Sequence, residues 1–259
     1  MAKELAELVE DAADLLAKAE KIVVFTGAGV STESGIPDFR GRDGLWTRYD
    51  PDDFTFQKFV SDPEARKRIW RGLASFAEVG QVEPNACHYA LAELHRLGKL
   101  DCVITQNVDG LHQQAGVPEE MVIELHGTTK YVKCLSCGRR YPRELIAQRL
   151  KEGVEDPTCD ECGGMLKSAA VFFGESMPMR EVAEAQRHSQ ACDLMFVLGS
   201  SLVVYPAAYM PAYAVQAGAR LVIINLDPTA MDEHADVCIY EKVGEVLPQV
   251  VEALKHRLD

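Results

Sequence analysis

Short, strongly apolar segments recur along the chain and alternate with segments whose apolar residues are spaced at helical intervals. The apolar segments cover residues 22–25, 102–105, 121–123, 194–198, 221–225 and 237–240. Their length is that of strands, and their continuous apolar character is typical of strands buried on both faces of a parallel sheet. The pattern predicts a doubly wound, Rossmann-type α/β sheet, in which ligands bind at the carboxyl ends of the strands.

Four segments between or beside these runs are predicted to be helices, over residues 1–20, 63–79, 85–97 and 244–258. The first of them lacks the basic start and the continuous apolar centre of a signal peptide. The longest apolar stretch, residues 202–215, contains two prolines and is shorter than the roughly 18 residues that a membrane span needs. We therefore expect a cytoplasmic protein with no membrane partner.

Two regions interrupt the alternation of strands and helices. Residues 41–83 begin as a polar loop and continue into a predicted helix, and residues 128–167 hold four of the eight cysteines. We expect these regions to form a smaller domain over the sheet, composed of a zinc ribbon and helices. Within a single catalytic domain of residues 1–259, the expected division is a Rossmann-type part over residues 1–46, 85–127 and 168–259, a helical module over residues 47–84 and a zinc ribbon over residues 128–167.

The cysteines predict a structural metal site. Four of them form two Cys-x2-Cys pairs separated by 21 residues, namely Cys134, Cys137, Cys159 and Cys162. Four thiolates at this spacing suit tetrahedral Zn²⁺, and a closed four-sulfur shell leaves no position for water or substrate. A pair of redox dithiols is the alternative, which Gly138 and Gly163 make less favourable because they follow the pairs as in zinc knuckles. The remaining cysteines lie singly in apolar or helical patterns and are expected in the core.

The composition bears mainly on the choice of partners. An apolar fraction of 47% and a charged fraction of 26% suit a globular enzyme with a substantial core. The formal net charge of −13 argues against nonspecific binding of nucleic acid and favours basic partners.

The first predicted strand runs into a glycine turn at Gly27, Ala28 and Gly29. Small residues between a strand and a helix let the backbone approach a phosphate, and the free amides at the helix start favour negative charge. Thr32 stands where the usual dinucleotide pattern has a third glycine, and taken alone the turn fits a tight connection equally well. Residues 35–37 break the helix early, which suits a loop that closes over a ligand.

Polar residues also follow the other predicted strands. Gln106, Asn107 and Asp109 follow the second strand, and His126 ends the third. His126 can reach a ligand there and titrate near neutral pH. His112, expected on a helix, is not expected to be the catalytic histidine. Two later strands are followed by short segments with hydroxyl and amide groups, Gly199, Ser200 and Ser201 after one and Asn225, Leu226 and Asp227 after the other. Helix capping by serine and aspartate is the plainer explanation of each.

Taken in order, these motifs resemble those of the sirtuins of the prokaryotic type. The resemblance rests on the glycine turn with its continuation through Phe39 and Arg40, on residues 105–109, on residues 125–127, on the four cysteines, on residues 173–175, on residues 199–201 and on Asn225. It covers the chain from about residue 20 to 250. Sirtuins are NAD-dependent protein-lysine deacylases, so the resemblance implies an enzyme that consumes NAD, carries one structural Zn²⁺ and acts on acetyl-lysine in proteins or peptides.

The resemblance also implies roles for individual residues. His126 would be the catalytic base, and the acyl-lysine peptide would bind at Val171, Phe173, Gly174, Glu175, Val203 and Val204. The NAD site would comprise Gly27, Ala28, Gly29, Glu33, Ile36, Asp38, Phe39, Arg40, Trp46, Gln106, Asn107, Val108, Asp109, Gly199, Ser200, Ser201, Asn225, Leu226, Asp227 and Val243. The implied products are deacetylated lysine, nicotinamide and O-acetyl-ADP-ribose.

Two departures from the family pattern bear on specificity. Asp38 stands where many sirtuins have threonine, which adds a negative charge beside the cofactor loop. Members that remove acidic acyl groups carry a tyrosine and an arginine at the positions held here by Gly72 and Ser75. We therefore expect acetyl or longer neutral acyl groups to be preferred over succinyl or malonyl groups.

Three other functions compete with deacetylation. A mono-ADP-ribosyltransferase would need almost the same site, but His126 and the substrate segment at residues 173–175 favour deacetylation. A zinc ribbon that reads nucleic acid has a local basic face at residues 130–140 in its favour and the net charge against it. A dehydrogenase fits less well because no residues are left to place a hydride acceptor.

Overall fold

The computed structural model describes residues 4–41, 44–78 and 82–258, so residues 1–3 and 79 of the predicted helices lie outside the described residues. Its central sheet has six parallel strands in the order β3-β2-β1-β7-β8-β9. The strands are β1 (Ile22–Thr26), β2 (Leu100–Thr105), β3 (Val122–Glu124), β7 (Leu194–Leu198), β8 (Arg220–Ile224) and β9 (Val237–Ile239). The predicted doubly wound sheet is thus confirmed, with the strand ends displaced by at most two residues.

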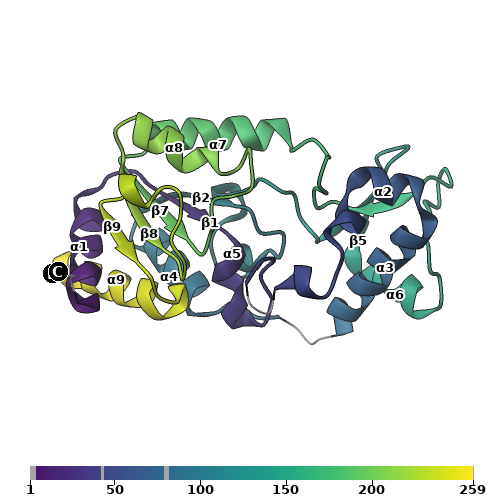
Figure 1. Cartoon of the computed structure of the whole chain (residues 1–259), viewed down its shortest axis with the longest axis horizontal. Coiled ribbons are helices and arrows are strands. Elements are labelled where there is room, and N and C mark those ends of the chain that lie inside the picture. The colour runs from purple at the N-terminus through teal and green to yellow at the C-terminus, as the bar shows by residue number, and fades with distance from the viewer. Residues whose placement is uncertain (1–3, 42–43, 79–81, 259) are drawn as a thin grey trace.

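Helices cover both faces of this sheet, as Figure 1 shows. One face packs against α1 (Leu5–Lys18), α4 (Ala86–Arg96) and α9 (Val243–Leu258), and the other against α7 (Met179–Ala191) and α8 (Tyr209–Gln216). Successive side chains of a strand point to opposite faces. In β1, Val24 therefore packs on the face covered by α1, α4 and α9 and Phe25 on the face covered by α7 and α8, and all five strand residues are buried.

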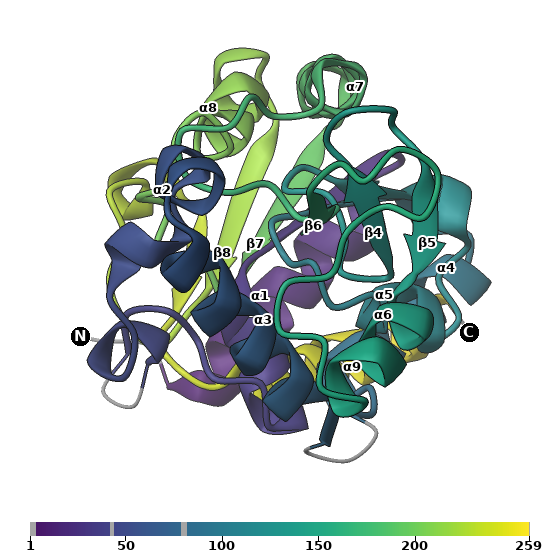
Figure 2. The ribbon, with the colours of Figure 1, turned by 90° about the vertical axis from the view of Figure 1, so that its right-hand side faces the viewer.

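A second core lies at the other end of the molecule. There a three-stranded antiparallel sheet, in the order β5-β4-β6, packs with helices α2, α3 and α6 (Figures 1 and 2). These elements are α2 (Phe56–Ser61), α3 (Pro63–Glu78), β4 (Tyr131–Cys134), β5 (Arg140–Pro142), α6 (Arg143–Lys151) and β6 (Leu166–Ser168). The core draws on both regions that interrupt the alternation in the sequence, so they fold against one another.

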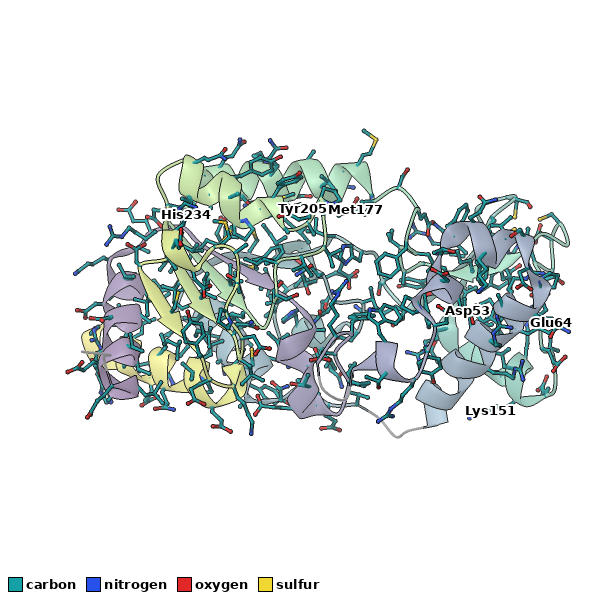
Figure 3. The ribbon with its side chains drawn as sticks, in the orientation of Figure 1. Asp53, Glu64, Lys151, Met177, Tyr205 and His234 are labelled. Atoms are coloured by element: carbon teal, nitrogen blue, oxygen red, sulfur yellow. The ribbon has the colours of Figure 1, made fainter. Side chains whose placement is uncertain are left out.

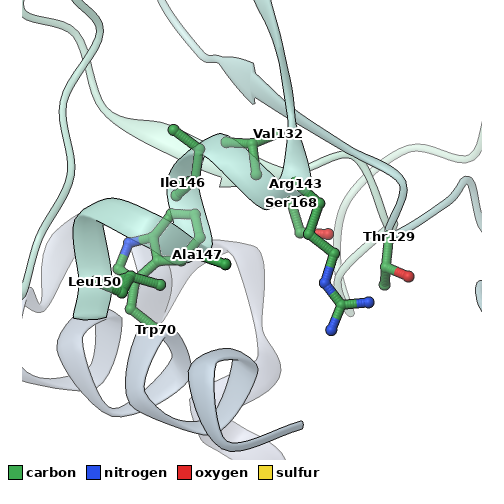
Figure 4. A pocket seen from close by; sticks show the side chains of 8 residues that line it. All are labelled: Trp70, Thr129, Val132, Arg143, Ile146, Ala147, Leu150 and Ser168. Atoms are coloured by element: carbon green, nitrogen blue, oxygen red, sulfur yellow. The ribbon is translucent and has the colours of Figure 1, made fainter. Parts of the chain in front are cut away.

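An ion pair and an aromatic contact join these two regions. The buried Arg66 of α3 forms a forked pair with Asp156, with nitrogen–oxygen distances of 2.7 to 3.0 Å. Such bidentate pairs are geometrically specific. Trp70, one turn further along α3, faces Ile146 and Leu150 of α6 across a small cavity (Figure 4). The contacts fix α3 against the cysteine-bearing segment.

The glycine turn lies where the strand order reverses, between β1 and β7. Gly27 N donates to Leu198 O and Gly29 N donates to Gly199 O, at 3.0 and 2.9 Å. A β-carbon on Gly27 would come within 2.7 Å of Gly199 O, and one on Gly29 within 2.8 Å of the same atom. The glycines are therefore required by the fit of two loops, in addition to any ligand.

The segment after the turn is a short 3-10 helix, η1 (Ala28–Ser34). Gly35 ends it with a φ of 87°, a backbone conformation that glycine adopts at no steric cost. The early break that the sequence predicted is confirmed. In consequence the chain turns away from the sheet and passes over its carboxyl edge.

The close packing of the glycine turn leads to a stability prediction with an internal control. Gly29→Ala should lower the free energy of unfolding by about 1–3 kcal/mol, because the added β-carbon would overlap Gly199. Gly72→Ala, in α3, meets no atom within 4 Å and should raise it by about 0.5–1 kcal/mol. Denaturant unfolding of both variants and the wild type measures these changes. A Gly29→Ala variant as stable as the wild type would contradict the packing explanation.

Candidate active site

The polar residues that follow β1 and β2 form one hydrogen-bonded group. The buried Asn107 donates from Nδ2 to Gly27 O at 3.1 Å and to Ser31 Oγ at 3.2 Å. Ser31 Oγ in turn donates to Asp109 Oδ2 at 2.8 Å. Asn107 and Asp109 are therefore held in fixed orientations at the strand ends by the segment that follows the glycine turn.

A second bond joins the end of β2 to the end of β7. Gln106 Nε2 donates to Ser200 Oγ at 2.8 Å, and Leu202 N donates to the same oxygen at 3.3 Å. Ser200 is buried and follows Gly199, which contacts the glycine turn. The strand-end residues predicted from the sequence on β1, β2 and β7 thus meet at one place.

His126 lies at the same edge, just beyond β3. Its Nδ1 is 2.9 Å from Gln106 O. Because a carbonyl oxygen only accepts, Nδ1 carries the proton in this contact and Nε2 keeps a free lone pair. Burial lowers the pKa of His126 below its ordinary value, although the bond to Gln106 O opposes the shift. The ring is therefore neutral near pH 7, with a basic nitrogen that can accept a proton from a ligand.

A buried chain of neutral groups supports this edge from below. Thr26 Oγ1 donates to Thr105 Oγ1 at 2.8 Å, and Thr105 Oγ1 accepts from Asn107 N at 3.0 Å. His112 Nε2 lies 3.0 Å from Thr26 Oγ1, and its ring centroid is 5.0 Å from that of His88. Burial lowers the pKa of His112 to about 3 and that of His88 to about 4, so both rings are uncharged.

His112 was not expected to take part in the site, and in the structure it contacts the pair of threonines that holds Asn107 N. The supporting role of Thr26 and Thr105 was not predicted. A usable signal was present, because each threonine is a polar residue that ends a run of at least three apolar strand residues. A buried hydroxyl at such a position needs a partner, and the two threonines supply one another.

The loop after η1 carries an aromatic cluster toward the second core. The ring centroids of Phe39 and Trp46 are 5.2 Å apart, and those of Trp46 and Phe173 are 6.0 Å apart. Phe39 remains 41% exposed beside the exposed Arg40. Asp38, the departure noted in the sequence, accepts from Gly41 N at 2.8 Å, so its carboxylate stabilises the loop's own turn.

Several predicted site residues have other structural partners. Glu33 accepts from Gly244 N at the start of α9, at 2.9 Å, and Val243 is buried in the core. Asn225 Nδ2 donates to Asp227 O at 2.7 Å. The side chain of Glu175 forms ion pairs with two lysines, which limits any contact with a peptide to its backbone. Predicted residues that are exposed or half-buried and open to a ligand include Ile36, Val108, Val171, Gly174, Ser201, Val203, Val204 and Leu226.

The four predicted metal ligands come together beside β4. Their sulfur atoms all lie within 4.8 Å of one another, with Cys134 and Cys162 at 3.5 Å and Cys137 and Cys159 at 3.6 Å. A tetrahedral Zn²⁺ with Zn–S bonds of about 2.3 Å needs sulfur–sulfur distances of about 3.8 Å. These two contacts join opposite pairs, as one shared ion requires and as two separate dithiols would not. The cysteines therefore fit one structural Zn²⁺.

The fold and site define the chain as a protein with a Rossmann-type sheet, a buried histidine ring at the carboxyl edge of that sheet and a four-cysteine metal module. Residues 27–206 match the model of the Sir2 family. The chain is 46% identical over 248 residues to NAD-dependent protein deacetylase 1 of Bradyrhizobium diazoefficiens, covering 95% of this chain and 96% of that protein. It is 45% identical over 249 residues, with the same coverage, to NAD-dependent protein deacylase 2 of Archaeoglobus fulgidus.

Solved structures of Sir2 proteins resemble the chain over nearly its whole length. One described by the mechanism and regulation of Sir2 enzymes superposes with a TM-score of 0.88 at 45% identity, over 98% of this chain and 99% of that chain. Another, of Sir2 with a p53 peptide and NAD⁺, has a TM-score of 0.84 at 39% identity, over 99% and 100%. The chain belongs to the Sir2 family. It is an NAD-dependent protein deacetylase.

Membrane insertion was the remaining question raised by the apolar stretch at residues 202–215. None of the helices in the described ranges is both long and apolar enough to cross a membrane.

Removal of the metal should unfold the module that the cysteines close. Cys137→Ser should reduce the bound zinc from about one ion per chain to a small fraction and destabilise the second core, because structural zinc supplies folding free energy directly. Elemental analysis and thermal unfolding measure the two effects. Cys238→Ser, outside the cluster, is the matched control and should retain the ion. Full zinc occupancy in Cys137→Ser would show that the cluster is not the site.

Proposed function

We propose that the protein removes acetyl groups from lysine side chains of basic proteins or peptides, with release of nicotinamide and O-acetyl-ADP-ribose. The observation that carries this proposal is the contact between His126 Nδ1 and Gln106 O at 2.9 Å, which leaves Nε2 of a neutral ring as a base. NAD supplies a ribose carbon that the acyl oxygen can attack when nicotinamide leaves. The residues of this chain would bind and orient NAD and the acetyl-lysine and would accept the proton.

The nicotinamide end of NAD would bind at Ala28, Ile36, Asn107, Val108 and Asp109. Asn107 and Asp109 are both bonded to Ser31 Oγ, so neither side chain has to be ordered when a ligand arrives. Polar groups fixed in this way favour one orientation of the nicotinamide amide.

The rest of the cofactor would extend along the sheet edge. Gly27 and Gly29 would hold the diphosphate, with Phe39, Arg40 and Trp46 in the loop above it. The adenosine end would lie near Gly199, Ser200, Ser201, Asn225, Leu226, Asp227 and Val243. Glu33 would act from η1, where its carboxylate accepts from Gly244 N at the start of α9. The turn at residues 27–29 carries no side chain larger than a methyl group, which supports this placement.

His126 would accept the proton of a ribose hydroxyl. A general base of this kind contributes about 10²–10⁴ in rate. Gln106 has two functions in this arrangement, since its carbonyl orients the histidine and its side chain binds Ser200. The ribose would contact Gln106 near His126.

The peptide would add as a strand to Phe173, Gly174 and Glu175 on one side and to Val203 and Val204 on the other, with Val171 in the wall of the acyl-lysine tunnel. Homologous structures contain a p53 peptide and a myristoylated histone peptide. The net charge of −13 supports basic partners and gives no support to nucleic acid as a ligand.

The acyl group would be neutral. Gly72 provides no cationic side chain, and Ser75 lies where side chains are outside the described part of the structure. Two arginines of α3 are already paired, Arg66 with Asp156 and Arg68 with Asp53, which is labelled in Figure 3. They are poorly placed to bind a succinyl or malonyl carboxylate.

We also propose the division into a Rossmann-type part over residues 1–46, 85–127 and 168–259, a helical module over 47–84 and a zinc ribbon over 128–167. The separate core shared by α2, α3 and α6 supports this division.

The protein would act in the cytoplasm. Four free thiolate ligands persist in a reducing compartment, which supports this location.

The test is to incubate the protein with NAD and an acetyl-lysine peptide and to identify the products by mass. We expect nicotinamide release that depends on the acetyl group, together with O-acetyl-ADP-ribose and a peptide lighter by one acetyl group. ADP-ribosylated protein without loss of acetyl would instead establish a mono-ADP-ribosyltransferase.

The same assay tests whether His126 is the catalytic base. His126→Ala should reduce turnover by about 10²–10⁴ while NAD binding, measured by calorimetry, stays within about twofold of the wild type. His234→Ala is the control, because this exposed histidine lies at the far end of the sheet from the second core (Figure 3). Wild-type turnover in His126→Ala would remove His126 from the proposed role.

The pH dependence of the rate gives a separate prediction. The base must be neutral, so activity is present above the pKa of His126 and is lost as the pH falls through it. Because burial lowers that pKa, the acid limb of kcat/KM should have its midpoint below 6.5, the ordinary value for histidine. A pH–rate profile at saturating NAD measures it. A midpoint at or above 6.5 would show that the neutral ring is not favoured as described.

A further inference from the structure

Glu175, at the end of the proposed peptide-binding segment, is held by two lysines of the three-stranded sheet. Lys167 Nζ is 2.8 Å from Glu175 Oε2, and Lys133 Nζ is 3.2 Å from Oε1. The lysine on β6 is 0% exposed, whereas that on β4 is 38% exposed. Glu175 therefore connects the cysteine-bearing module to the segment that runs past the active site.

The two lysines lie directly opposite one another in the sheet. In the antiparallel register of β4 and β6, Lys133 is the partner of Lys167. Like charges at directly opposed positions repel and destabilise a strand pair. The carboxylate of Glu175 contacts both ammonium groups and offsets that repulsion. The sheet thus places two ammonium groups where they can bind one carboxylate. That carboxylate is the side chain of Glu175 in the segment at residues 171–175.

The carboxylate also closes a turn. Glu175 N donates to Phe172 O at 3.0 Å, and Phe172 N donates back to Glu175 Oε2 at 3.1 Å. The Lys167 ammonium lies 4.0 Å from the centroid of the Phe172 ring and donates to Ser168 O and Ala170 O. Residues 168–175 therefore surround the buried ammonium group of Lys167.

This wrapped segment reaches the catalytic edge. Val171 N donates to His126 O at 2.8 Å, and Phe173 pairs with the backbone of Phe54 and Phe56. Both backbone groups of Phe173 are thereby used, whereas a β-carbon on Gly174 would meet no atom within 4 Å. The open backbone of the segment lies at Gly174, immediately beside the residue that the lysines hold.

The protonation states suit a permanent ion pair. Burial lowers the pKa of Lys167 to about 8, partly offset by Glu175, so the amine stays mostly charged at neutral pH. Burial opposes ionisation of Glu175, but the hydrogen bonds from Lys167 and from Phe172 N outweigh it, and the pKa of the carboxyl is lowered. A buried charge that loses its partner is strongly destabilising, so the two groups hold one another in place.

We propose that Lys167 is a positioning residue for the peptide, which acts through Glu175 to hold the turn at residues 172–175 in the shape that pairs with the substrate backbone. Lys133 holds the other oxygen of the Glu175 carboxylate, and more weakly, because its side chain is partly exposed to water. The inference rests on the proposed function, in which residues 173–175 add a strand to the peptide. In this arrangement the side chain of Glu175 binds the lysines, and the backbone that is open to the substrate lies at Gly174.

The variants that test this are Lys167→Met and Glu175→Gln, assayed with a ten-residue acetyl-lysine peptide and with a single blocked acetyl-lysine. We expect Lys167→Met to raise KM for the peptide about tenfold, with KM for NAD within about twofold. KM for the single residue should rise much less, because it is too short to pair as a strand. A merely structural defect would raise both substrate KM values or lower the active fraction, which zinc content and thermal unfolding report.

Lys99→Met is the matched control. Lys99 also donates to two backbone carbonyls, Ala17 O and Ala19 O, but it lies on the sheet-bearing part before β2. This variant should lose stability without any change in KM for the peptide. Lys133→Met, whose side chain is half-buried at the surface, should raise KM for the peptide about threefold and provides a folded variant if Lys167→Met does not fold.

A double-mutant cycle decides whether the lysine acts through the carboxylate. If it does, Lys167→Met combined with Glu175→Gln should raise KM for the peptide no more than either change alone, whereas independent effects would multiply. Unchanged peptide KM in Lys133→Met and Glu175→Gln, or a multiplicative double variant, would overturn the inference. Failure of the wild type to deacetylate any peptide would instead overturn the proposed function.

Discussion

The close approach of two loops at the reversal of strand order is the constraint on which the active site depends. Gly27 and Gly29 contact the backbone around Gly199 so closely that neither could carry a side chain. Because β1 and β7 are neighbours, their connections diverge in opposite directions and leave a crevice at the carboxyl edge. The polar groups of the site reach that edge from the ends of β1, β2, β3 and β7, which is why residues far apart in sequence meet there.

The proposed cofactor and peptide sides of the site are stabilised by different forces. On the cofactor side, Asn107, Ser31, Thr26, Thr105 and His112 form a network of neutral groups, since burial keeps the histidine uncharged, and Ser31 joins this network to the carboxylate of Asp109. Such a network changes little with salt or moderate pH, because none of its members gains or loses charge near neutrality. On the peptide side the fixed element is an ion pair, Lys167 with Glu175, whose strength comes from its exclusion of water.

The strands, the helices α1, α3, α4 and α9 and the metal cluster could be predicted from the sequence because each depends on a local pattern. Continuous apolar runs identify strands buried on both faces, and cysteine spacing identifies ligands that converge. Side-chain partners were less predictable. Glu33 was assigned to the cofactor, and the structure shows its carboxylate bonded to Gly244, 211 residues away. The roles assigned to individual cofactor and peptide contacts, and the division into modules, remain predictions.

Lys167 shows why such partners escape a sequence analysis. A lysine is ordinarily a solvated surface residue, and the sequence around Lys167 does not show that Glu175 will lie beside its amine. Its burial follows from the register of β4 and β6, in which Cys134 is opposite Leu166 and Lys133 is opposite Lys167. A metal ion that holds Cys134 would fix that register and thereby the position of both amines. A closed four-sulfur site can in this way determine how a peptide binds without touching the peptide or the cofactor.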